Sequence, residues 1–340
     1  MSGWACRFLT ILALLLATPA LARSVTDSAG RRVEIPDTVT RVFAAGPPAS
    51  VLLHTVAPEK MIGWGRAPRE AEKPYLMPGV RDLPELGRLT GRGDTLNLER
   101  LIAEKPDLIV DFGTVSDTYR SLADRVQEQT GIPYLLIDGR FENTVTALRL
   151  MAGILGAPER GEALAKAAEQ IFADLDEALI RIPAGKRPRV YLARGPEGLE
   201  TGSRGSINTE IIERAGGVNV VEGLREKGGI VSVSGEQLIA WAPNTIITLD
   251  RGFRQSVKDK PVWQPVPTVA GGRIFLAPNL PFGFVDSPPS VNRLIGLTWL
   301  RHTLYPGGDP AKLRDEVRAF YKLFYQVELA DADLDRLLGS

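Results

Sequence analysis

Short runs of β-branched and other apolar residues alternate along this chain with longer segments whose apolar residues recur at helical spacing. One such unit occurs twice, at residues 97–111 and again at residues 234–248. Each copy predicts a short helix, a proline that ends it and a buried strand. The repetition predicts two α/β lobes of similar plan, and we expect a ligand site in the cleft between them. The two copies share the pairs Glu99/Glu236, Leu101/Leu238, Ile102/Ile239, Ala103/Ala240, Pro106/Pro243 and Ile109/Ile246.

The strands expected in each half of the chain are separated by helical segments. Pro47-Pro48 opens a helix that runs through Val56, since proline suits the first turn of a helix. Strands that alternate with helices predict the α/β class, with a mostly parallel sheet covered on both faces. The first half has a hairpin at residues 24–36 and strands at residues 41–45, 61–64, 108–111 and 134–137. The second half has strands at residues 189–193 and 273–276 and a helix near residues 208–215.

A helical segment without strand signals joins the two halves, and Pro183 ends it. A helix of about 25 residues spans about 37 Å, which is long enough to bridge two lobes. The tail is also helical, over residues 290–304, 310–325 and 331–338. The predicted organisation is a signal peptide (1–22), an N-terminal α/β lobe (23–141), a linking helix (142–182) and a C-terminal α/β lobe with terminal helices (183–340).

The N-terminus has the features of an export signal. Arg7 precedes an apolar run at residues 8–17, and Ala20-Leu21-Ala22 fits a small-x-small cleavage site. The run is shorter than the roughly 20 residues of a spanning helix, so a non-cleaved anchor is the alternative. Because Cys6 lies upstream of the run and not at the cleavage site, we expect a soluble periplasmic protein rather than a lipoprotein.

Composition excludes several classes of function for the mature chain. Of 41 basic and 41 acidic residues, cleavage after Ala22 removes only Arg7, which leaves 40 basic, 41 acidic and a net charge near −1. This balance argues against nucleic-acid binding, which requires a basic surplus. Loss of Cys6, the single cysteine, excludes disulfides and thiol catalysis. The only histidines, His54 and His302, are too few and too far apart to predict a metal site.

Catalytic motifs are absent from the sequence. Neither a Gly-x-Ser-x-Gly nucleophile elbow nor a Walker-type phosphate loop occurs. Asp111 and Asp250 follow strands, where catalytic acids are common, but no nucleophile or base pairs with them by motif. A periplasmic enzyme therefore stays open only as an alternative, and no catalytic residue is predicted.

Arginine and aromatic residues recur where the predicted strands end. Ligands of open α/β sheets collect beyond the carboxyl ends of the strands. Arginine offers planar donors to anionic oxygens, and aromatic rings offer flat apolar contact. The set predicts a bulky anionic ligand, although solvated loop arginines and core phenylalanines are the alternative. The expected contacts are Trp64, Arg66, Arg92, Arg194, Arg204, Phe282 and Phe284.

The chain resembles the class III periplasmic substrate-binding proteins, the receptors of ABC importers for ferric siderophores, haem and cobalamin. The resemblance rests on the opening at residues 25–36, on the repeated unit and on Gly216-Gly217-Val218-Asn219. It implies two Rossmann-like lobes joined by one long helix, a ligand between them and only small closure. It also implies docking on the permease through one acidic side chain per lobe, for which Glu72 and Glu222 are the candidates; ordinary surface carboxylates are the alternative.

The expected function is a monomeric periplasmic receptor that binds a chelated metal, with a ferric siderophore as the first candidate. It would deliver this ligand to an ABC importer permease and would carry no cofactor or metal site of its own. Haem or a corrinoid is the alternative within the same class. A haem receptor would need an axial tyrosine or histidine, and Tyr75 and Tyr119 are candidates.

Overall fold

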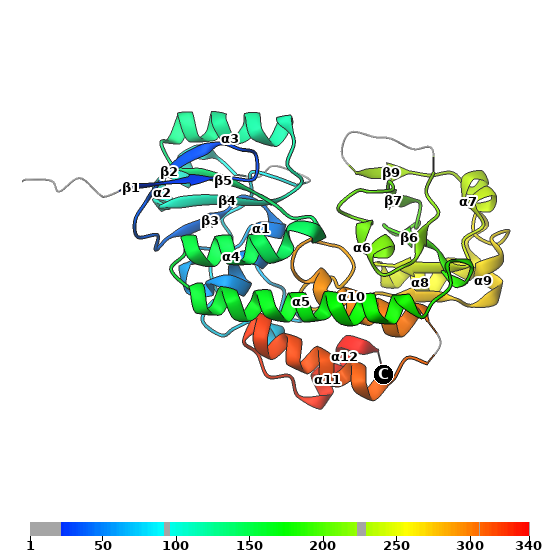
Figure 1. Cartoon of the computed structure of the whole chain (residues 1–340). Helices are drawn as coiled ribbons and strands as arrows, with labels where there is room; N and C mark the ends of the chain where they lie inside the picture. The colour runs from blue at the N-terminus through cyan, green and yellow to red at the C-terminus, as the bar shows by residue number, and fades with distance from the viewer. Residues whose placement is uncertain (1–21, 92–95, 223–228, 306, 340) are drawn as a thin grey trace, which may run out of the picture.

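The computed structural model describes residues 22–91, 96–222, 229–305 and 307–339. Two α/β lobes lie side by side, and a long helix runs beneath both of them (Figure 1). No helix within these ranges is both long and apolar enough to cross a bilayer. Residues 1–21 of the predicted signal peptide and Arg92 lie outside the described residues.

The first lobe contains a parallel sheet in the order β3-β4-β5, formed by Val42–Ala44, Leu108–Gly113 and Tyr134–Asp138. Its strands are almost wholly buried, as expected for a parallel sheet covered on both faces. The predicted hairpin is confirmed as the antiparallel pair β1 and β2. The remaining elements are β1 (Ala22–Thr26), β2 (Arg32–Pro36), α1 (Pro47–Val56), η1 (Pro58–Lys60), η2 (Lys73–Tyr75), α2 (Leu98–Glu104) and α3 (Asp117–Thr130).

The strand predicted at residues 61–64 is wrong in extent. Met61 makes a single bridge to Val42, and Trp64 makes another to Glu85. Glycine is required at position 63, because a side chain there would collide with Leu86 and with the carbonyl oxygen of Pro84. The segment thus passes close to residues 84–86 without forming a regular strand.

The second lobe contains a parallel sheet in the order β11-β10-β6-β8. A short antiparallel pair, β7 and β9, lies beside it. The strands are β6 (Arg189–Ala193), β7 (Glu200–Gly202), β8 (Val218–Asn219), β9 (Ile230–Ser232), β10 (Thr245–Thr248) and β11 (Ile274–Leu276). The helices are η4 (Ala184–Lys186), α6 (Glu210–Arg214), α7 (Gly235–Trp241), α8 (Arg251–Ser256), η5 (Val257–Asp259) and α9 (Pro267–Gly271).

The repeated unit occupies equivalent places in the two lobes, as α2–β4 and α7–β10. Both helices begin at a side-chain cap, Asn97 in one and Ser234 in the other. Both end at a left-handed residue directly before the shared proline, Lys105 and Ala242. The strand that follows is interior to its sheet in each lobe, so the predicted two-lobed α/β fold is confirmed.

The linking segment is two helices rather than one. η3 (Phe141–Asn143) leads into α4 (Thr144–Ile154), and α5 (Pro158–Ile180) follows after a turn. Gly161 brings α5 against Ala152 of α4 at a distance that leaves no room for a side chain. α5 is the helix that extends beneath both lobes (Figure 1).

The terminal helices return to the first lobe. α10 (Arg293–Leu304) packs on α5, and α11 (Pro310–Phe320) continues into the π-helical turn η6 (Tyr321–Tyr325), which contacts α1. Tyr75 of the first lobe donates a hydrogen bond to the carbonyl oxygen of Asp333 in α12 (Asp331–Leu338). One hydrophobic core consequently runs through both lobes and the terminal helices.

A fully buried arginine joins the lobes at this junction. The Arg293 guanidinium donates to the carbonyl oxygens of Gly139 and Ile207, each at 2.7 Å, and forms an ion pair with Glu210. It also lies over the ring of Phe141, 4.3 Å from its centre. These contacts tie the end of the first lobe to the second and fix the width of the space between them.

Candidate functional site in the interlobe cleft

A cavity of about 690 Å³ opens between the lobes. It is lined by residues that follow strands β3, β4 and β6, the edge at which parallel α/β sheets collect ligands. The loop at residues 286–289, which leads into α10, supplies one wall. A contiguous hollow of about 210 Å³ shares Arg66, Arg88 and Asp286 with it. Together these two spaces form the interlobe cleft.

Four arginines line the interlobe cleft, and they come from both lobes; Arg69 lines only the smaller hollow. Arg66 and Arg88 belong to the first lobe and Arg194 follows β6 of the second. Arg66 and Arg194 were predicted from their places after strands, whereas Arg88 was not. Arg88 follows a short bridge rather than a strand, so no pattern in the sequence marked it. Guanidinium groups on both walls can donate several hydrogen bonds to anionic oxygens.

Arg66 and Arg194 form ion pairs with buried carboxylates. Arg66 donates to both oxygens of Glu72 at 3.0 Å, and the Glu72 side chain is almost completely buried. In the opposite wall Arg194 forms an ion pair with Asp286, which is 1% exposed. Asp286 also accepts hydrogen bonds from Asn208 of the second lobe. The sequence did not predict Asp286, although it follows Phe284, a predicted contact, by only two residues.

Asp111 in the last part of β4 is a further acidic group that lines the cleft. Its carboxylate accepts hydrogen bonds from Thr90 at 3.2 Å and from Tyr134 at 3.3 Å. Burial raises the pKa of Asp111 to about 6, against the opposing effect of these two hydrogen bonds. Tyr119 lines the same wall, and burial followed by the charge of Asp111 raises its pKa. The first lobe therefore offers hydroxyl and carboxyl groups to the same cavity as the arginines.

Aromatic rings form the floor of the smaller hollow. Trp64 and Phe282 line it, with ring centres 6.2 Å apart, and the Trp64 indole donates to the carbonyl oxygen of Val80. His54 packs behind both rings and against Tyr325. Burial, followed by the charge of Arg160, lowers the pKa of His54 to about 3, so this ring is a neutral core group. Trp64 and Phe282 are thus placed as predicted, at the cleft.

Other predicted contacts lie elsewhere. Phe284 is fully buried in the core, so for this residue the alternative of a core phenylalanine holds and the predicted ligand contact does not. Arg204 donates to the carbonyl oxygen of Asn219 and to Glu222, and it is not among the residues that line the cleft. Glu72, expected as a docking carboxylate, is buried in the cleft wall instead of exposed. Glu222 keeps the exposure that a docking residue needs.

The remaining titratable candidates have structural partners. His302 contacts Glu316, and Asp250 caps α8 by accepting a hydrogen bond from the Phe253 N–H. Tyr75 is buried with its hydroxyl bonded, so only Tyr119 of the two proposed axial ligands reaches the cleft. Across the described ranges, no group of three His, Cys, Asp or Glu side chains is placed to hold a metal ion.

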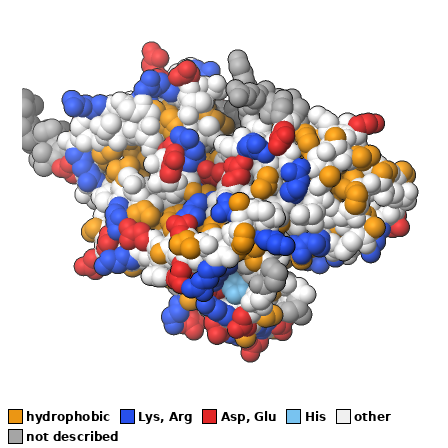
Figure 2. Space-filling model, turned by 45° about the vertical axis from the view of Figure 1, so that its right-hand side comes forward, with side chains coloured by type: hydrophobic (Ala, Val, Ile, Leu, Met, Phe, Trp, Pro, Cys, Tyr) orange, Lys and Arg blue, Asp and Glu red, His pale blue; other side chains and the backbone are white. Residues whose placement is uncertain are grey.

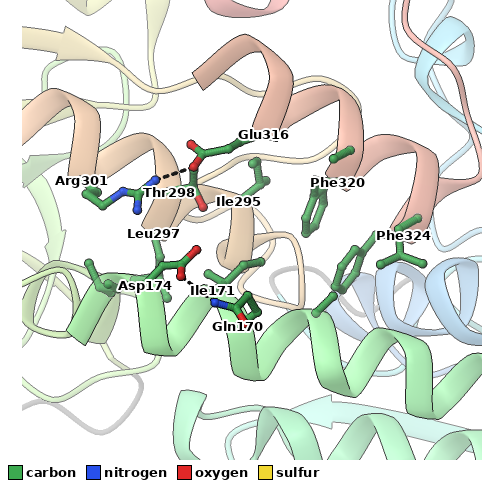
Figure 3. Close-up of a pocket in the computed structure, with 14 residues that line it drawn as sticks. Gln170, Ile171, Asp174, Ile295, Leu297, Thr298, Arg301, Glu316, Phe320 and Phe324 are labelled. Atoms are coloured by element: carbon green, nitrogen blue, oxygen red, sulfur yellow. Dashed lines mark hydrogen bonds and ion pairs between the residues drawn. The ribbon is translucent and has the colours of Figure 1, made fainter. Parts of the chain in front are cut away.

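A separate cavity of about 220 Å³ lies between α5, α10 and α11 (Figure 3). Most of its lining is aliphatic or aromatic, and Phe320 and Phe324 form one side of it. Polar side chains in its lining bond to one another, Arg301 to Glu316 and Gln170 to Asp174. No strand end opens into it, so the interlobe cleft is the better candidate for a ligand site.

Comparison with known proteins agrees with this geometry. A family model described as periplasmic binding protein matches residues 65–280, well over half of the chain. The chain belongs to this family. Its resemblance to the class III receptors of ABC transporters is thereby confirmed, and it is a receptor of an ABC importer rather than an enzyme. The family is periplasmic, and its members bind the ligand that is transported instead of a cofactor.

The relatives of this periplasmic binding protein are named after different ligands. The molybdate-binding protein MolA of Haemophilus influenzae is 27% identical, over 92% of this chain and 93% of the relative. A vitamin B12-binding protein of Salmonella choleraesuis is 28% identical, over 71% of this chain and 78% of the relative. The structure of an ABC transporter solute binding protein from Sulfurospirillum deleyianum superposes with a TM-score of 0.84 at 29% identity, covering 94% and 99% of the two chains.

Proposed function

We propose that this receptor binds an anionic metal chelate of the ferric siderophore class in the interlobe cleft and delivers it to an ABC importer. The observation that carries the proposal is the placement of Arg66, Arg88 and Arg194 around one cavity of about 690 Å³. Ligand pockets for molecules of drug size occupy about 300–1,000 Å³. The contacts that we retain from the sequence hypothesis are Trp64, Arg66, Arg194 and Phe282. Trp64 and Phe282 would contact flat or apolar parts of the chelate.

Molybdate is the second candidate. The relative named as a molybdate-binding protein aligns over nearly the whole of both chains. A tetrahedral oxyanion presents acceptor oxygens in several directions, and guanidinium groups from both walls could meet them. So small an anion would leave most of the cavity of about 690 Å³ unfilled, which is why we place the chelate first.

Titration calorimetry with four probes distinguishes the candidates: a ferric tris-catecholate chelate, sodium molybdate, hemin and cyanocobalamin. We expect the ferric chelate to bind, and Arg66→Ala and Arg194→Ala each to lose about 1.5–3 kcal/mol, or roughly ten- to hundred-fold in affinity. Arg204→Ala is the matched control, since this arginine pairs with Glu222 away from the cleft. Binding of hemin or cyanocobalamin alone, or normal binding by both cleft variants, would overturn the proposal.

The remaining partner assignments follow from the same proposal. We infer that the exported chain is cleaved after Ala22 and acts as a monomer, and that Glu222 is a docking carboxylate for the permease. Its side chain is 60% exposed and lies in the second lobe. Glu222→Gln should leave ligand affinity unchanged and reduce stimulation of the reconstituted permease, and equal stimulation would remove this role.

A further inference from the structure

We propose that Glu72 and Asp286 are positioning residues that hold Arg66 and Arg194 in the orientation in which they contact the ligand. The inference rests on the proposed function, in which Arg66 and Arg194 bind the ligand. It gives each lobe the same device, a cleft arginine held from behind by a buried carboxylate. It also replaces the docking role that the sequence suggested for Glu72.

Glu72 is the centre of a dense set of hydrogen bonds. Its two oxygens accept from the Arg66 guanidinium at 3.0 Å, from the Arg69 guanidinium at 2.7 and 2.9 Å, and from the Arg69 backbone N–H at 2.7 Å. Only 4% of the Glu72 side chain is exposed, whereas 55% of the Arg66 side chain is. The carboxylate is thus fixed in the wall, and the two arginines that it holds, Arg66 and Arg69, project from that wall.

Asp286 has the same relation to the second lobe. It accepts from the Asn208 amide at 3.1 and 3.2 Å and from the Ser287 backbone N–H at 2.8 Å, in addition to its ion pair with Arg194. Its side chain is 1% exposed and that of Arg194 is 20% exposed. Asp286 therefore joins three cleft-lining groups, Arg194, Asn208 and its own loop, into one rigid assembly.

Positioning and simple charge balance predict opposite results. A carboxylate that acted only as a countercharge would weaken the attraction of the cleft for an anion, so its neutralisation would raise affinity. A carboxylate that holds an arginine in place spares the ligand the entropy cost of immobilising that long side chain. Its neutralisation would then lower affinity, by about 2- to 10-fold for one side chain.

The test is a double-mutant cycle with the ferric tris-catecholate chelate and sodium molybdate as probes. Glu72→Gln and Asp286→Asn should each lower affinity by about 2- to 10-fold. The effect of Glu72→Gln should vanish when Arg66→Ala and Arg69→Ala are both present, because Glu72 holds both arginines, and the effect of Asp286→Asn should vanish when Arg194→Ala is present. Glu70→Gln is the matched control for the first cycle, because Glu70 is exposed and pairs with Lys73 instead. Raised affinity, or losses that persist without these arginines, would overturn the inference.

A second readout needs no ligand. In nitrogen-15 NMR of the free protein, the Arg66 and Arg194 guanidinium signals, assigned by the alanine variants, should report restricted motion in the wild type. Glu72→Gln and Asp286→Asn should release it, whereas Glu70→Gln should not. If neither the ferric chelate nor molybdate binds, the proposed function fails. The guanidinium signals still decide whether the carboxylates restrain the arginines. Signals that are the same in wild type, Glu72→Gln and Asp286→Asn would overturn the inference.

Discussion

The Asp111 carboxyl is buried in the cleft wall, where its pKa is raised to about 6 from an ordinary value of 3.8. Between these two pH values the folded protein holds a proton that the unfolded chain releases. The free energy of unfolding therefore falls as the pH rises through this range, by about 3 kcal/mol in all once the pH lies well above 6. The charged form of Asp111 thus destabilises the empty receptor at neutral pH.

Replacement of Asp111 by asparagine should remove this penalty. Because asparagine keeps one acceptor oxygen for Thr90 or Tyr134, we expect a gain of about 1–2 kcal/mol at pH 7.5 and little or none near pH 4. Urea unfolding of wild type and Asp111→Asn at the two pH values measures it. A variant that is less stable than wild type at pH 7.5 would show that the hydrogen bonds outweigh the burial of the charge.

His54 produces the opposite pH dependence. Its pKa is lowered from 6.5 to about 3, so the unfolded chain binds a proton below pH 6.5 that the folded protein excludes. Stability is then lost as the pH falls, by about 2–3 kcal/mol between pH 7 and pH 4.5. His54→Phe keeps a ring among Trp64, Phe282 and Tyr325 and should lack this loss.

The measurement is urea unfolding of His54→Phe and wild type at pH 7 and pH 4.5. Asp111 offsets part of the wild-type dependence, so the comparison is the difference between the two proteins at each pH. The stability of His54→Phe relative to wild type should rise as the pH falls. A constant difference would mean that His54 is protonated in the folded protein.

Single contacts were the least predictable part of the site. Trp64, Arg66, Arg194 and Phe282 lie at the cleft, while Arg204 and Phe284 do not. The outcome for each arginine depends on which carboxylate reaches it. Arg194 is held by Asp286 from a distant part of the chain, and Arg204 is drawn to the nearby Glu222. Position after a strand indicates the edge of a sheet but does not specify these partners.

Helix α10 and the loop before it meet at Gly296. A methyl group at Gly296 would overlap the carbonyl oxygen of Phe284, so the loop that carries Phe282 and Asp286 would have to move. Gly296→Ala should therefore cost about 1–3 kcal/mol of stability and also weaken ligand binding. Gly153→Ala in α4 is the control, because its methyl group would meet open space and should gain up to about 1 kcal/mol.

Thermal or urea unfolding with a binding titration of both variants checks this contact. Equal stability of Gly296→Ala and wild type would show that α10 can shift without cost. Loss of stability with unchanged affinity would show that the packing of this loop on α10 does not affect ligand binding in the cleft.

Elements with strong local signals were predicted well. The repeated helix–proline–strand units appear as α2–β4 and α7–β10, each with a capping side chain at its start. The linking segment was predicted as one helix, and the turn around Gly156 divides it. Helical periodicity continues across such a break, because α4 and α5 both face the same core.

The arrangement of the whole molecule was only partly visible in the sequence. Two matching lobes followed from the repeated unit. The return of the terminal helices to the first lobe did not, because an amphipathic face does not specify its partner. The mixture of acidic and basic side chains over the surface in Figure 2 agrees with the near-zero net charge and shows no broad basic face in that view.

The two lobes are tied together at several places beneath the cleft. Arg293 bonds to residues on both sides, and Ser290 donates a hydrogen bond to the carbonyl oxygen of Pro48 at 2.8 Å. Ser290 and Arg293 lie directly after the loop that lines the cleft. The ligand wall and the interlobe junction are therefore one continuous segment, which suits a receptor whose lobes keep their spacing.

Native mass spectrometry of the receptor purified from the periplasm of its own host tests the central claim most directly. The account predicts that wild type and Arg204→Ala retain the same anionic, metal-containing molecule in equal proportion. The double variant Arg66→Ala, Arg194→Ala should retain little or none of it, since two charge-assisted contacts would cost about 3–6 kcal/mol. The same bound mass at full occupancy in the double variant would contradict an arginine-lined interlobe site.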